Sequence, residues 1–600
     1  MISSKIALRR LVATAFVALC TGAAAQAQAQ APARPAARVK PSTSDPRYTL
    51  KGGLTDAQEI AKNMTLVAHR PRPATFANPN DAGDYAFWNS DLAFDGKYAF
   101  QGSFNGFQIW DISDPKNPTL RTSFPCPGGQ GDLSVRGRLM FMSVEENKGR
   151  LDCGGQGVSQ AVSAERFRGV RIFDISDIDH PRQVAAVQTC RGSHTHTLLA
   201  DPSDSANVYI YVSGTADVRS SAELAGCSDG SPSSDTATAR FRIDVIRVPL
   251  AAPQDARIVS RPRIFADPRT NAVSGLWKGG SHGAGTQQTA ETDQCHDITV
   301  YPEIGLAAGA CSGNGVLLDI SDPANPKRVD EVIDPNFAYW HSATFNNDGT
   351  KLLFSDEWGG GTSARCRATD RMTWGADAIF SLRNRKLTAQ GHYKLPAAQS
   401  EVENCVAHNG TLIPVPGRDI MVQAWYQGGL SVFDFTDPKR PFEIAYFDRG
   451  AINPTELKVA GFWSGYWYNG HIYGTEMGRG LDVFQLTPSE HLTQNEIDAA
   501  NDVQVAGNNP QTQQKIVWLP SFSLARAYAD QLDRGKGLVI AQVTSIKASL
   551  GMAEQQTGAA RRTTLQALAS RLDRAVASAR DGARVAKLSA TVKRLAIAAE

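Results

Sequence analysis

The sequence has almost no net charge, few histidines and only one long apolar run. Its 62 Lys and Arg residues nearly balance 60 Asp and Glu residues, which leaves a net charge of +2. Because nucleic-acid binding needs a basic surface, this balance gives no support for a nucleic acid as partner. The sequence also lacks the Walker phosphate-binding loop and the dinucleotide-binding fingerprint. The remaining function classes are ligand binding and enzyme chemistry that uses neither a nucleoside triphosphate nor a dinucleotide cofactor.

The apolar run lies at the N-terminus. Basic residues precede the stretch Leu11–Ala18, and small residues follow it, which is the order typical of a secretory signal peptide. We expect residues 1–29 to be this peptide, and residues 30–60, which are rich in Pro, Ala and Gln, to be a disordered linker. The protein is therefore predicted to be secreted or periplasmic, with no transmembrane segment once the signal peptide is removed.

One phrase recurs along the chain with gradual change. Its copies are GFQIWDISDPKNP (106–118), GVRIFDISDIDHP (169–181), GVLLDISDPANP (315–326) and GLSVFDFTDPKRP (429–441). In each copy a β-rich apolar run ends in Asp-Ile-Ser-Asp or a close variant, followed by a turn that ends at a proline. The Asp and Ser side chains can bind nearby backbone amides while Pro fixes φ, so the phrase indicates a structural turn. An internal repeat of this length is typical of solenoids and propellers.

Each repeat is predicted to contain four short strands, and units begin near residues 88, 131, 195, 296, 340, 407 and 463. The last unit ends at Gly480–Leu486 without a fourth strand, whereas Met64–His69 looks like a fourth strand without a unit. Pairing these two segments would close a ring and remove exposed sheet edges. We therefore predict an all-β, seven-bladed β-propeller over residues 61–486. Six and eight blades are the alternatives, because the third and last units diverge most.

Residues 487–600 differ in composition from the repeats. Ala, Arg, Leu and Gln replace Gly and aromatic residues, and apolar residues recur at helical spacing in Phe522–Leu532 and Leu565–Val576. We predict a small all-α C-terminal domain over residues 487–600, most simply a docking or capping bundle.

The repeats resemble the LVIVD-repeat family of secreted bacterial β-propeller proteins. The matching features are the Ile-Phe-Asp-Ile-Ser-Asp and Leu-Leu-Asp-Ile-Ser-Asp-Pro phrases, Val-Phe-Asp-Phe-Thr-Asp-Pro, and His-Asp-Ile-Thr-Val at the start of a unit. The resemblance covers about residues 64–486. It implies the propeller fold and export from the cytoplasm, but it implies little about biochemistry.

Eight cysteines remain once Cys20 in the predicted signal peptide is set aside. An even number in an exported chain favours disulfides over metal ligation or catalysis. Sequence alone does not fix how they pair, but their positions within the repeats favour Cys126–Cys153, Cys190–Cys227 and Cys295–Cys311, with Cys366–Cys405 remaining.

One column of the aligned repeats carries histidine four times. The position before the first strand of each unit holds Ser90, Gly131, His196, His296, His341, His408 and Trp463. Because the first strand of a propeller blade lines the central channel, the four imidazoles are expected to converge there. Converging neutral nitrogen donors suit one transition metal, namely iron, zinc or copper. His194 is a fifth candidate, since alternate residues of a strand point the same way.

Two further columns carry polar side chains that would face the same channel. The residues that follow the histidines, Asp297, Ser342 and Asn409, are predicted to orient the imidazoles through hydrogen bonds. Weak candidates for catalysis come after the second strand of three units: Glu145, Glu357 and Glu476. Solvated charges at the rim are the alternative interpretation of these glutamates.

Two functions are compatible with these patterns. In the first, the protein is an extracytoplasmic binding module with a His-lined channel, which recognises a ligand or a cell-surface partner through the long Gly-rich inserts at 146–168, 214–238, 267–293 and 358–376. In the second, it is a metal-dependent enzyme that uses the four histidines. Iron would favour oxidase or oxygenase chemistry and zinc would favour hydrolysis. A metal-free, hydrogen-bonded polar channel is the alternative to both metal hypotheses.

Overall fold

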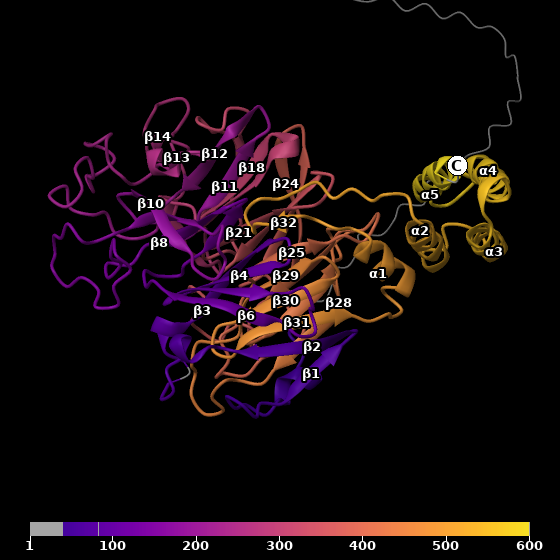
Figure 1. Ribbon diagram of the computed structural model, residues 1–600, viewed down its shortest axis with the longest axis horizontal. Coiled ribbons are helices and arrows are strands. Elements are labelled where there is room, and N and C mark those ends of the chain that lie inside the picture. Colours follow the sequence, from indigo (N-terminus) through magenta and orange to yellow (C-terminus); the bar gives the residue numbers. More distant parts are fainter. Residues whose placement is uncertain (1–39, 82, 599–600) are drawn as a thin grey trace, which may run out of the picture. The chain divides into compact units, whose positions relative to one another are not determined.

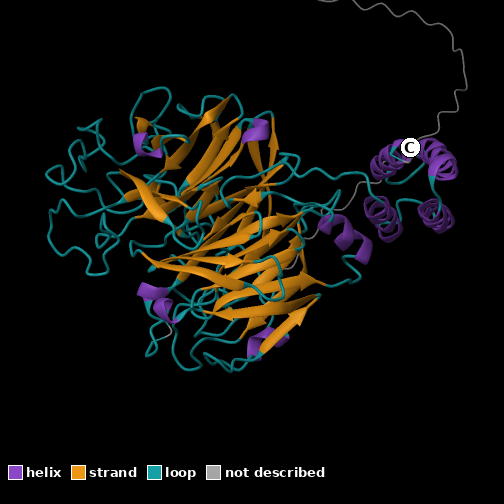
Figure 2. Cartoon of the chain, viewed as in Figure 1, coloured by secondary structure: helices purple, strands orange, loops and turns teal. Residues whose placement is uncertain are grey.

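The computed structural model describes residues 40–81 and 83–598, and most of this chain is β-sheet with a helical region at the C-terminal end (Figures 1 and 2). The predicted signal peptide, 1–29, and the first part of the predicted linker, 30–39, lie outside the described residues. None of the helices in the described ranges is both long enough and apolar enough to span a bilayer.

Antiparallel sheets of consecutive strands follow one another along the chain. The first three consist of β3 (Asn89–Asp95), β4 (Tyr98–Ser103), β5 (Gly106–Asp111) and β6 (Thr119–Pro125); β7 (Leu133–Arg136), β8 (Leu139–Val144), β9 (Gly169–Asp174) and β10 (Arg182–Gln188); and β11 (Thr197–Asp201), β12 (Asp204–Val212), β13 (Asp244–Pro249) and β14 (Arg257–Ser260). The next two consist of β17 (Asp297–Tyr301), β18 (Leu306–Cys311), β19 (Asn314–Asp319) and β20 (Lys327–Val332); and β21 (Trp340–Phe345), β22 (Lys351–Asp356), β23 (Asp377–Arg383) and β24 (Lys386–Tyr393). A separate hairpin joins β15 (Lys278–Ser281) to β16 (Gln288–Glu291).

The last strands of the β-domain form one nine-stranded sheet. Its order is β1 (Glu59–Lys62), β28 (Phe442–Arg449), β27 (Leu430–Asp434), β26 (Ile420–Ala424), β25 (Asn409–Ile413), β29 (Phe462–Tyr468), β30 (His471–Glu476), β31 (Gly480–Leu486) and β2 (Met64–Pro71). The β25 and β29 strands meet through a short parallel contact at Asn409–Gly410. On one side of that contact lie five antiparallel strands, β1 and β25–β28, and on the other side lie four, β29–β31 and β2. The predicted pairing of Met64–His69 with Gly480–Leu486 is confirmed.

The recurring phrase forms the predicted turn. In each copy the first Asp, at the end of the third strand of its sheet, accepts a hydrogen bond from the backbone amide two residues later: Asp111 from Ser113, Asp174 from Ser176, Asp319 from Ser321 and Asp434 from Thr436. These bonds satisfy amides that leave the sheet ladder. The phrase is therefore structural in every copy.

Hydrophobic clusters fill the space between neighbouring sheets. In one of them Leu139 and Phe141 of β8 pack with Val208 and Ile210 of β12 in the next sheet, and all four are buried. Alternate residues of a strand point to opposite faces, so each sheet contributes side chains to the clusters on both of its sides. Burying one such side chain stabilises the fold by about 1.5–3 kcal/mol.

Four disulfides link Cys126 to Cys153, Cys190 to Cys227, Cys295 to Cys311 and Cys366 to Cys405. This is the pairing that the positions in the repeats favour. Several disulfides in one chain suggest an extracytoplasmic location, because cytosolic thiols are kept reduced.

Residues 40–60 are not a disordered linker, and that prediction is wrong for this part. Arg47 is 1% exposed and forms ion pairs with Asp45 and with Glu443 of β28. Its guanidinium also lies 3.7 Å from the ring centroid of Tyr446. Composition alone suggested disorder, but one buried, doubly paired arginine and the pairing of β1 with β28 fix the segment on the β-domain.

A segment that we call the strap, residues 505–518, follows helix α1 (Gln494–Asn501) and crosses the first strands of five sheets. Its short strand β32 (Gly507–Asn508) pairs with β3. The residues after β32 hydrogen-bond to the first strands of the other four sheets. Asn509 binds Val135 of β7, and Thr512 binds Leu198 of β11. Gln511 and Gln513 bind Val300 of β17 through their backbones, and the Gln513 side chain also binds Phe345 of β21. Seven extended residues span at most about 25 Å. The first strands of these sheets therefore converge on one place, as in a propeller.

The helical region contains α2 (Phe522–Arg534), α3 (Ile540–Gln555), α4 (Gly558–Ala575) and α5 (Gly582–Ile597). A common apolar core, which includes Leu532, Leu550, Leu568 and Val592, holds these four together. The prediction of helices at the C-terminal end is confirmed for α2–α5. The predicted boundary at 487 is wrong for the strap, because those residues hydrogen-bond to the β-sheets instead of continuing the helical pattern.

Candidate metal centre and pocket

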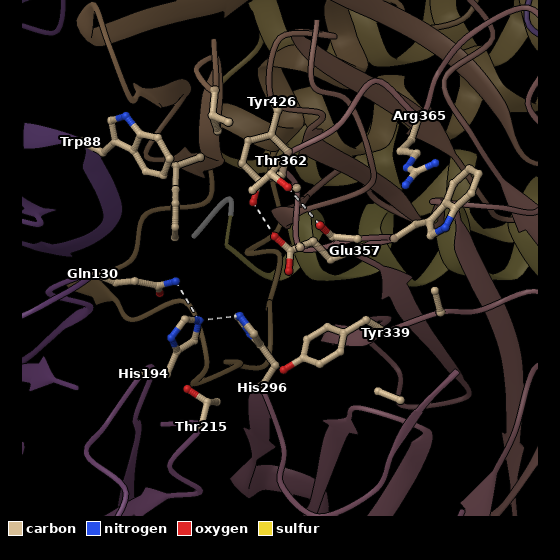
Figure 3. Close-up of a pocket in the computed structure, with 18 of the residues that line it drawn as sticks. Trp88, Gln130, His194, Thr215, His296, Tyr339, Glu357, Thr362, Arg365 and Tyr426 are labelled. Carbon is tan, nitrogen blue, oxygen red and sulfur yellow. Dashed lines mark hydrogen bonds between the residues drawn. The ribbon is translucent and has the colours of Figure 1, made fainter. Parts of the chain in front are cut away.

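A cavity of about 1030 Å³ opens beside the histidine column (Figure 3). Three of the four Gly-rich inserts contribute to its wall, through Thr215, through Gln287–Ala290 and through Trp358–Thr362. The inserts therefore line a pocket, as their length suggested. The strap binds the opposite ends of the first strands, since it contacts Val300 while His296 precedes the same strand.

One wall of the pocket is aromatic. The rings of Trp88 and Phe104 lie 5.6 Å apart between centroids, and Phe104 lies 6.0 Å from Trp463, both with edge-to-face geometry. Tyr85 packs against Trp88 and Phe104. Such a wall binds planar or apolar organic groups through their flat faces.

His194 lies at the floor of the pocket between a carboxylate and a second imidazole. Its Nδ1 is 2.6 Å from Oε1 of Glu145, and its Nε2 is 2.7 Å from Nε2 of His296. Gln130 approaches the same Nε2 at 2.7 Å (Figure 3). A carboxylate on one ring nitrogen directs the other nitrogen, and this arrangement is common for histidines that bind metals.

His296, His341 and Glu357 form the tightest group of metal-ligating side chains. One ligand atom from each lies within 4.8 Å of the other two, and all three residues are buried. Nε2 of His341 is 3.9 Å from Glu357, and Nε2 of His408 is 3.8 Å from the same carboxylate. Ligands on one zinc or iron ion are about 3–4 Å apart, so a small inward shift of these side chains would complete a coordination shell.

The nitrogens of this cluster differ in their hydrogen bonds. Nδ1 of His408 donates to the backbone carbonyl of Trp463, and this leaves Nε2 facing Glu357. Nε2 of His341 is buried and has no hydrogen-bond partner, although buried polar atoms normally have one. Tyr426 donates its hydroxyl proton to Oε1 of Glu357 over 2.5 Å and so fixes the carboxylate. The cluster thus presents unshared lone pairs at a position that the surrounding protein does not satisfy.

Burial and charge set the protonation of the cluster. Burial lowers the pKa of His341 well below its usual value, and the neighbouring imidazoles lower it further. Burial has the same effect on His296 and takes the pKa of His408 to about 3. Burial raises the pKa of Glu357 to about 7. Neutral imidazoles are the form that binds metals, so these three histidines are ready to bind at neutral pH.

The His194 and Glu145 side chains are mutually stabilised in their charged forms. Burial lowers the pKa of His194, but the Glu145 carboxylate more than offsets this effect, and the pKa is raised. Burial raises the pKa of Glu145, but the charge of His194 outweighs it and the pKa is lowered. His194 therefore differs electrostatically from the other three imidazoles of the floor.

His196 does not join the cluster, although it shares the sequence column. Its Nε2 lies 2.6 Å from Oγ of Ser134, and its Nδ1 lies 2.8 Å from Oγ of Ser143. Both ring nitrogens are therefore occupied. The chain bends at His194–Thr195 before β11 begins at Thr197, so the alternation of a strand does not apply there. His194, the fifth candidate, takes the place beside His296.

The three residues predicted to orient the imidazoles have different partners. Asp297 lies 3.0 Å from Nδ1 of His296, as expected. Ser342 binds Ser355 instead of an imidazole, and Asn409 donates to Asp91. Ser355 itself lies 3.5 Å from Nδ1 of His341. The alignment of the repeats placed these residues near the imidazoles, but it did not predict their hydrogen-bond partners. A side chain at the start of a strand can reach the adjacent sheet as easily as its own sheet.

The three glutamates that were candidates for catalysis do not all lie at the pocket. Glu145 and Glu357 line the pocket floor, whereas Glu476 accepts from the backbone amides of Gly461 and Gly478 and pairs with Arg479. Glu476 is 1% exposed and Glu357 is 7% exposed. The interpretation of these two as solvated rim charges is therefore wrong. Glu476 holds a turn, and Glu357 belongs to the candidate metal centre.

Comparison with known proteins bears on the repeat. A family model described as "LVIVD repeat" matches residues 89–125, which are the residues from the start of β3 to the end of β6. The chain carries an LVIVD repeat. The resemblance inferred from the recurring phrases is confirmed for this sheet.

Solved structures that resemble this chain are distant. The periplasmic gluconolactonase of Pseudomonas aeruginosa aligns with a TM-score of 0.38 and 11% identity over 66% of this chain and 97% of its own. A proposed 6-phosphogluconolactonase from Bacteroides fragilis aligns with a TM-score of 0.37 and 10% identity over 65% of this chain and 91% of its own. Comparison with curated proteins gives no significant match. At these values neither likeness bears on activity.

Some residues of the site have no counterpart in the aligned columns of the sequence repeats. Tyr426 follows β26 with a positive φ of 52°, and Gln130 and Arg365 come from segments outside the strands. Trp463 orients His408 through its backbone carbonyl, although the sequence alignment of the repeats drew attention to its side chain.

Proposed function

We propose that this chain is a secreted or periplasmic seven-bladed β-propeller that binds one transition metal at the floor of its pocket and an organic ligand above the metal. Residues 61–486 form the propeller, and the C-terminal helices are an appendage. The pairing of β2 with β31 and the convergence of first strands beneath the strap support the closed ring.

The observation that carries the metal proposal is the position of His341 Nε2. This nitrogen is buried, has no hydrogen-bond partner and faces Glu357 and the ring of His296, whose centroid lies 3.8 Å from that of His341. An unsatisfied buried nitrogen costs about 1–3 kcal/mol. A bound cation would remove this cost and would also stabilise the charged form of Glu357. Iron, zinc and copper all accept two imidazoles and one carboxylate.

The metal content of the protein purified from its native compartment tests this proposal. We expect about one iron, zinc or copper ion per chain, and loss of that ion in the His296→Ala/His341→Ala double variant. His180→Ala is the matched control, because His180 is exposed and, within the described residues, its side chain pairs with Asp177 alone. Substoichiometric metal in both the wild type and the double variant would refute the metal site and leave a polar, metal-free binding pocket.

A metal-dependent enzyme is the second candidate function. A set of two histidines and one carboxylate leaves positions open on the ion, and the pocket supplies a route to them. Azide added to the metal-loaded protein tests for an open position. A change in the ligand-field spectrum of the iron, copper or cobalt form is expected, whereas an unchanged spectrum would indicate that protein atoms fill the shell and that the centre is structural.

A further inference from the structure

Arg365 is a cation in the pocket wall without a counter-ion. Among the described residues that line the pocket, it is the one with a Lys or Arg side chain. Its guanidinium lies 4.0 Å from the ring centroid of Trp358. Its Nε is buried without a hydrogen-bond partner, and in the described part of the chain no carboxylate lies within ion-pair distance of it. Figure 3 shows it on the far side of Glu357 from His194.

Buried arginines in the described part of the β-domain have oxygen partners, either carboxylates or, as for Arg171, backbone carbonyls and a side-chain amide. Arg418 binds Asp434 and Glu496, and Arg449 binds Glu59 and Asp482. These pairs show how the fold normally neutralises a guanidinium, since a buried charge without a partner is costly. Within the ranges that the structure describes, the guanidinium of Arg365 donates to no oxygen atom, and its side chain lines the pocket, where a ligand from solvent can reach it.

The backbone around Arg365 is held in place. The next residue, Cys366, is bonded to Cys405, and the Ala364 backbone pairs with that of Cys405. The Nζ of Lys394 donates to the carbonyl of Arg365 over 2.7 Å. A fixed backbone and a stacked guanidinium pre-organise the donors, so little conformational entropy is lost when an anion binds.

Space beside the guanidinium is kept open by glycine. Gly359 has φ of 81°, and a Cβ built there would lie 3.5 Å from Nη2 of Arg365. The neighbouring Gly360 and Gly361 also have positive φ. Any other residue at these positions would be strained, and at Gly359 it would also cover one face of the donors.

We propose that the pocket takes a planar organic carboxylate, with the carboxylate bound by Arg365 and the apolar body against the aromatic wall of Trp88, Phe104 and Trp463. This inference rests on the proposed function only in that it uses the same pocket, and it does not require the metal. The two carboxylates of the floor do not compete for Arg365, because Glu145 binds His194 and Glu357 binds Tyr426. A guanidinium matches a carboxylate with two parallel hydrogen bonds, which sets the ligand class.

Matched probes test the proposal: 2-naphthoate, 2-naphthamide and 2-naphthyl phosphate, with binding followed by titration calorimetry on the full-length protein. We expect the naphthoate to bind about ten-fold or more tightly than the amide, as is typical for a charge-assisted pair. Arg365→Gln should remove this preference, whereas Arg371→Gln should keep it. Arg371 is the control because it also stacks on a tryptophan, Trp374, but does not line the pocket.

Several outcomes would overturn the proposal. Equal affinity for naphthoate and naphthamide, or no binding of any probe, would exclude a carboxylate site. Tighter binding of 2-naphthyl phosphate than of 2-naphthoate would show that the site prefers a phosphate ester to a carboxylate. The His296→Ala/His341→Ala variant separates this inference from the metal proposal. If that variant loses the preference while Arg365→Gln keeps it, the carboxylate binds the metal and not Arg365. If the protein holds no metal but Arg365 still sets the preference, the carboxylate site stands alone.

Discussion

The hydroxyl of Tyr426 and the carboxylate of Glu357 share a short hydrogen bond at the floor of the pocket, 2.5 Å from oxygen to oxygen. The bond joins a residue that follows β26 to one that follows β22, and it leaves Oε2 of Glu357 directed at His341. It therefore fixes the orientation of the carboxylate, with Oε2 towards His341 and Oε1 towards His408.

Removing this hydroxyl should weaken metal binding without abolishing it. Partners that orient a ligand usually contribute about 10–100-fold to metal affinity, so Tyr426→Phe should raise the metal dissociation constant by about that factor. Competition with a chelator of known affinity measures the change. Tyr209→Phe, on a strand away from the pocket, is the control. An unchanged affinity in Tyr426→Phe would mean that Glu357 is not a ligand.

His196 and His194 should respond to mutation in opposite ways. His196 is fully buried with both ring nitrogens bonded to serine hydroxyls, so His196→Ala leaves a cavity and unpaired hydroxyls. We expect a loss of about 2–5 kcal/mol in the free energy of unfolding, with no change in metal content. His194→Ala should instead reduce metal content with a smaller effect on stability, because the His194 ring contacts Nε2 of the proposed ligand His296 and holds it in place. Urea unfolding and elemental analysis of both variants make the comparison, and loss of metal in folded His196→Ala would contradict it.

Acid should weaken the junction between the β-domain and the helical region through Glu496. Burial raises the pKa of this carboxyl, but Arg534 and Arg418 outweigh burial and lower the pKa from its ordinary 4.5 to about 2. Because the pKa in the folded state is depressed, the stabilisation is fully present above about pH 4.5. It is lost as the pH falls from there towards 2.

The size of this effect is about 3 kcal/mol at neutral pH, by linkage between protonation and folding. Glu496→Gln should remove it. The variant should be less stable than the wild type at pH 7, and the difference should shrink steadily between pH 4.5 and pH 2. Unfolding curves at a series of pH values measure the gap. A gap that stays constant with pH would show that Glu496 acts by packing alone.

The strap should contribute measurably to the stability of the β-domain. The side chain of Asn509 accepts from the amide of Val135 and donates to its carbonyl, at 2.8 Å and 3.0 Å. Asn509→Ala leaves both backbone groups without these partners, and a loss of about 1–3 kcal/mol is expected in urea unfolding. Gln514→Ala, at an exposed strap position, should change stability by no more than about 0.5 kcal/mol. Equal effects of the two variants would mean that the hydrogen bonds of the strap do not stabilise the β-domain and that the strap only connects it to the helices.

The repeats made much of the fold predictable, because a period in the sequence reports which residues are equivalent in space. The turn phrase located the third strand of several sheets, and the strand left over at Met64–His69 identified its partner. The strap was not predictable in this way. Its contacts come from single Asn, Thr and Gln side chains that bind backbone groups, and such contacts leave no apolar pattern.

The site was predictable in outline for a similar reason. Equivalence brought His296, His341 and His408 together, but it could not distinguish His194 from His196, because that choice depends on a local bend. It also could not select Arg365 or Tyr426, which lie outside the strands that carry the repeat. The position of a residue on a repeated strand can be predicted from the period of the repeat. The position of a residue on an insert depends on local contacts that the repeat does not encode.

The seam between β2 and β31 sets the order in which the molecule can be completed. His69 and Asp482, which bond across it, are 413 positions apart, and the strap is translated later still. Until residue 486 has emerged, β2 has no partner in the last sheet, and unpaired edges of this kind invite aggregation and proteolysis. A product cut short before residue 486 would thus carry an open ring. Closure of the ring therefore requires that the chain has been made at least as far as β31.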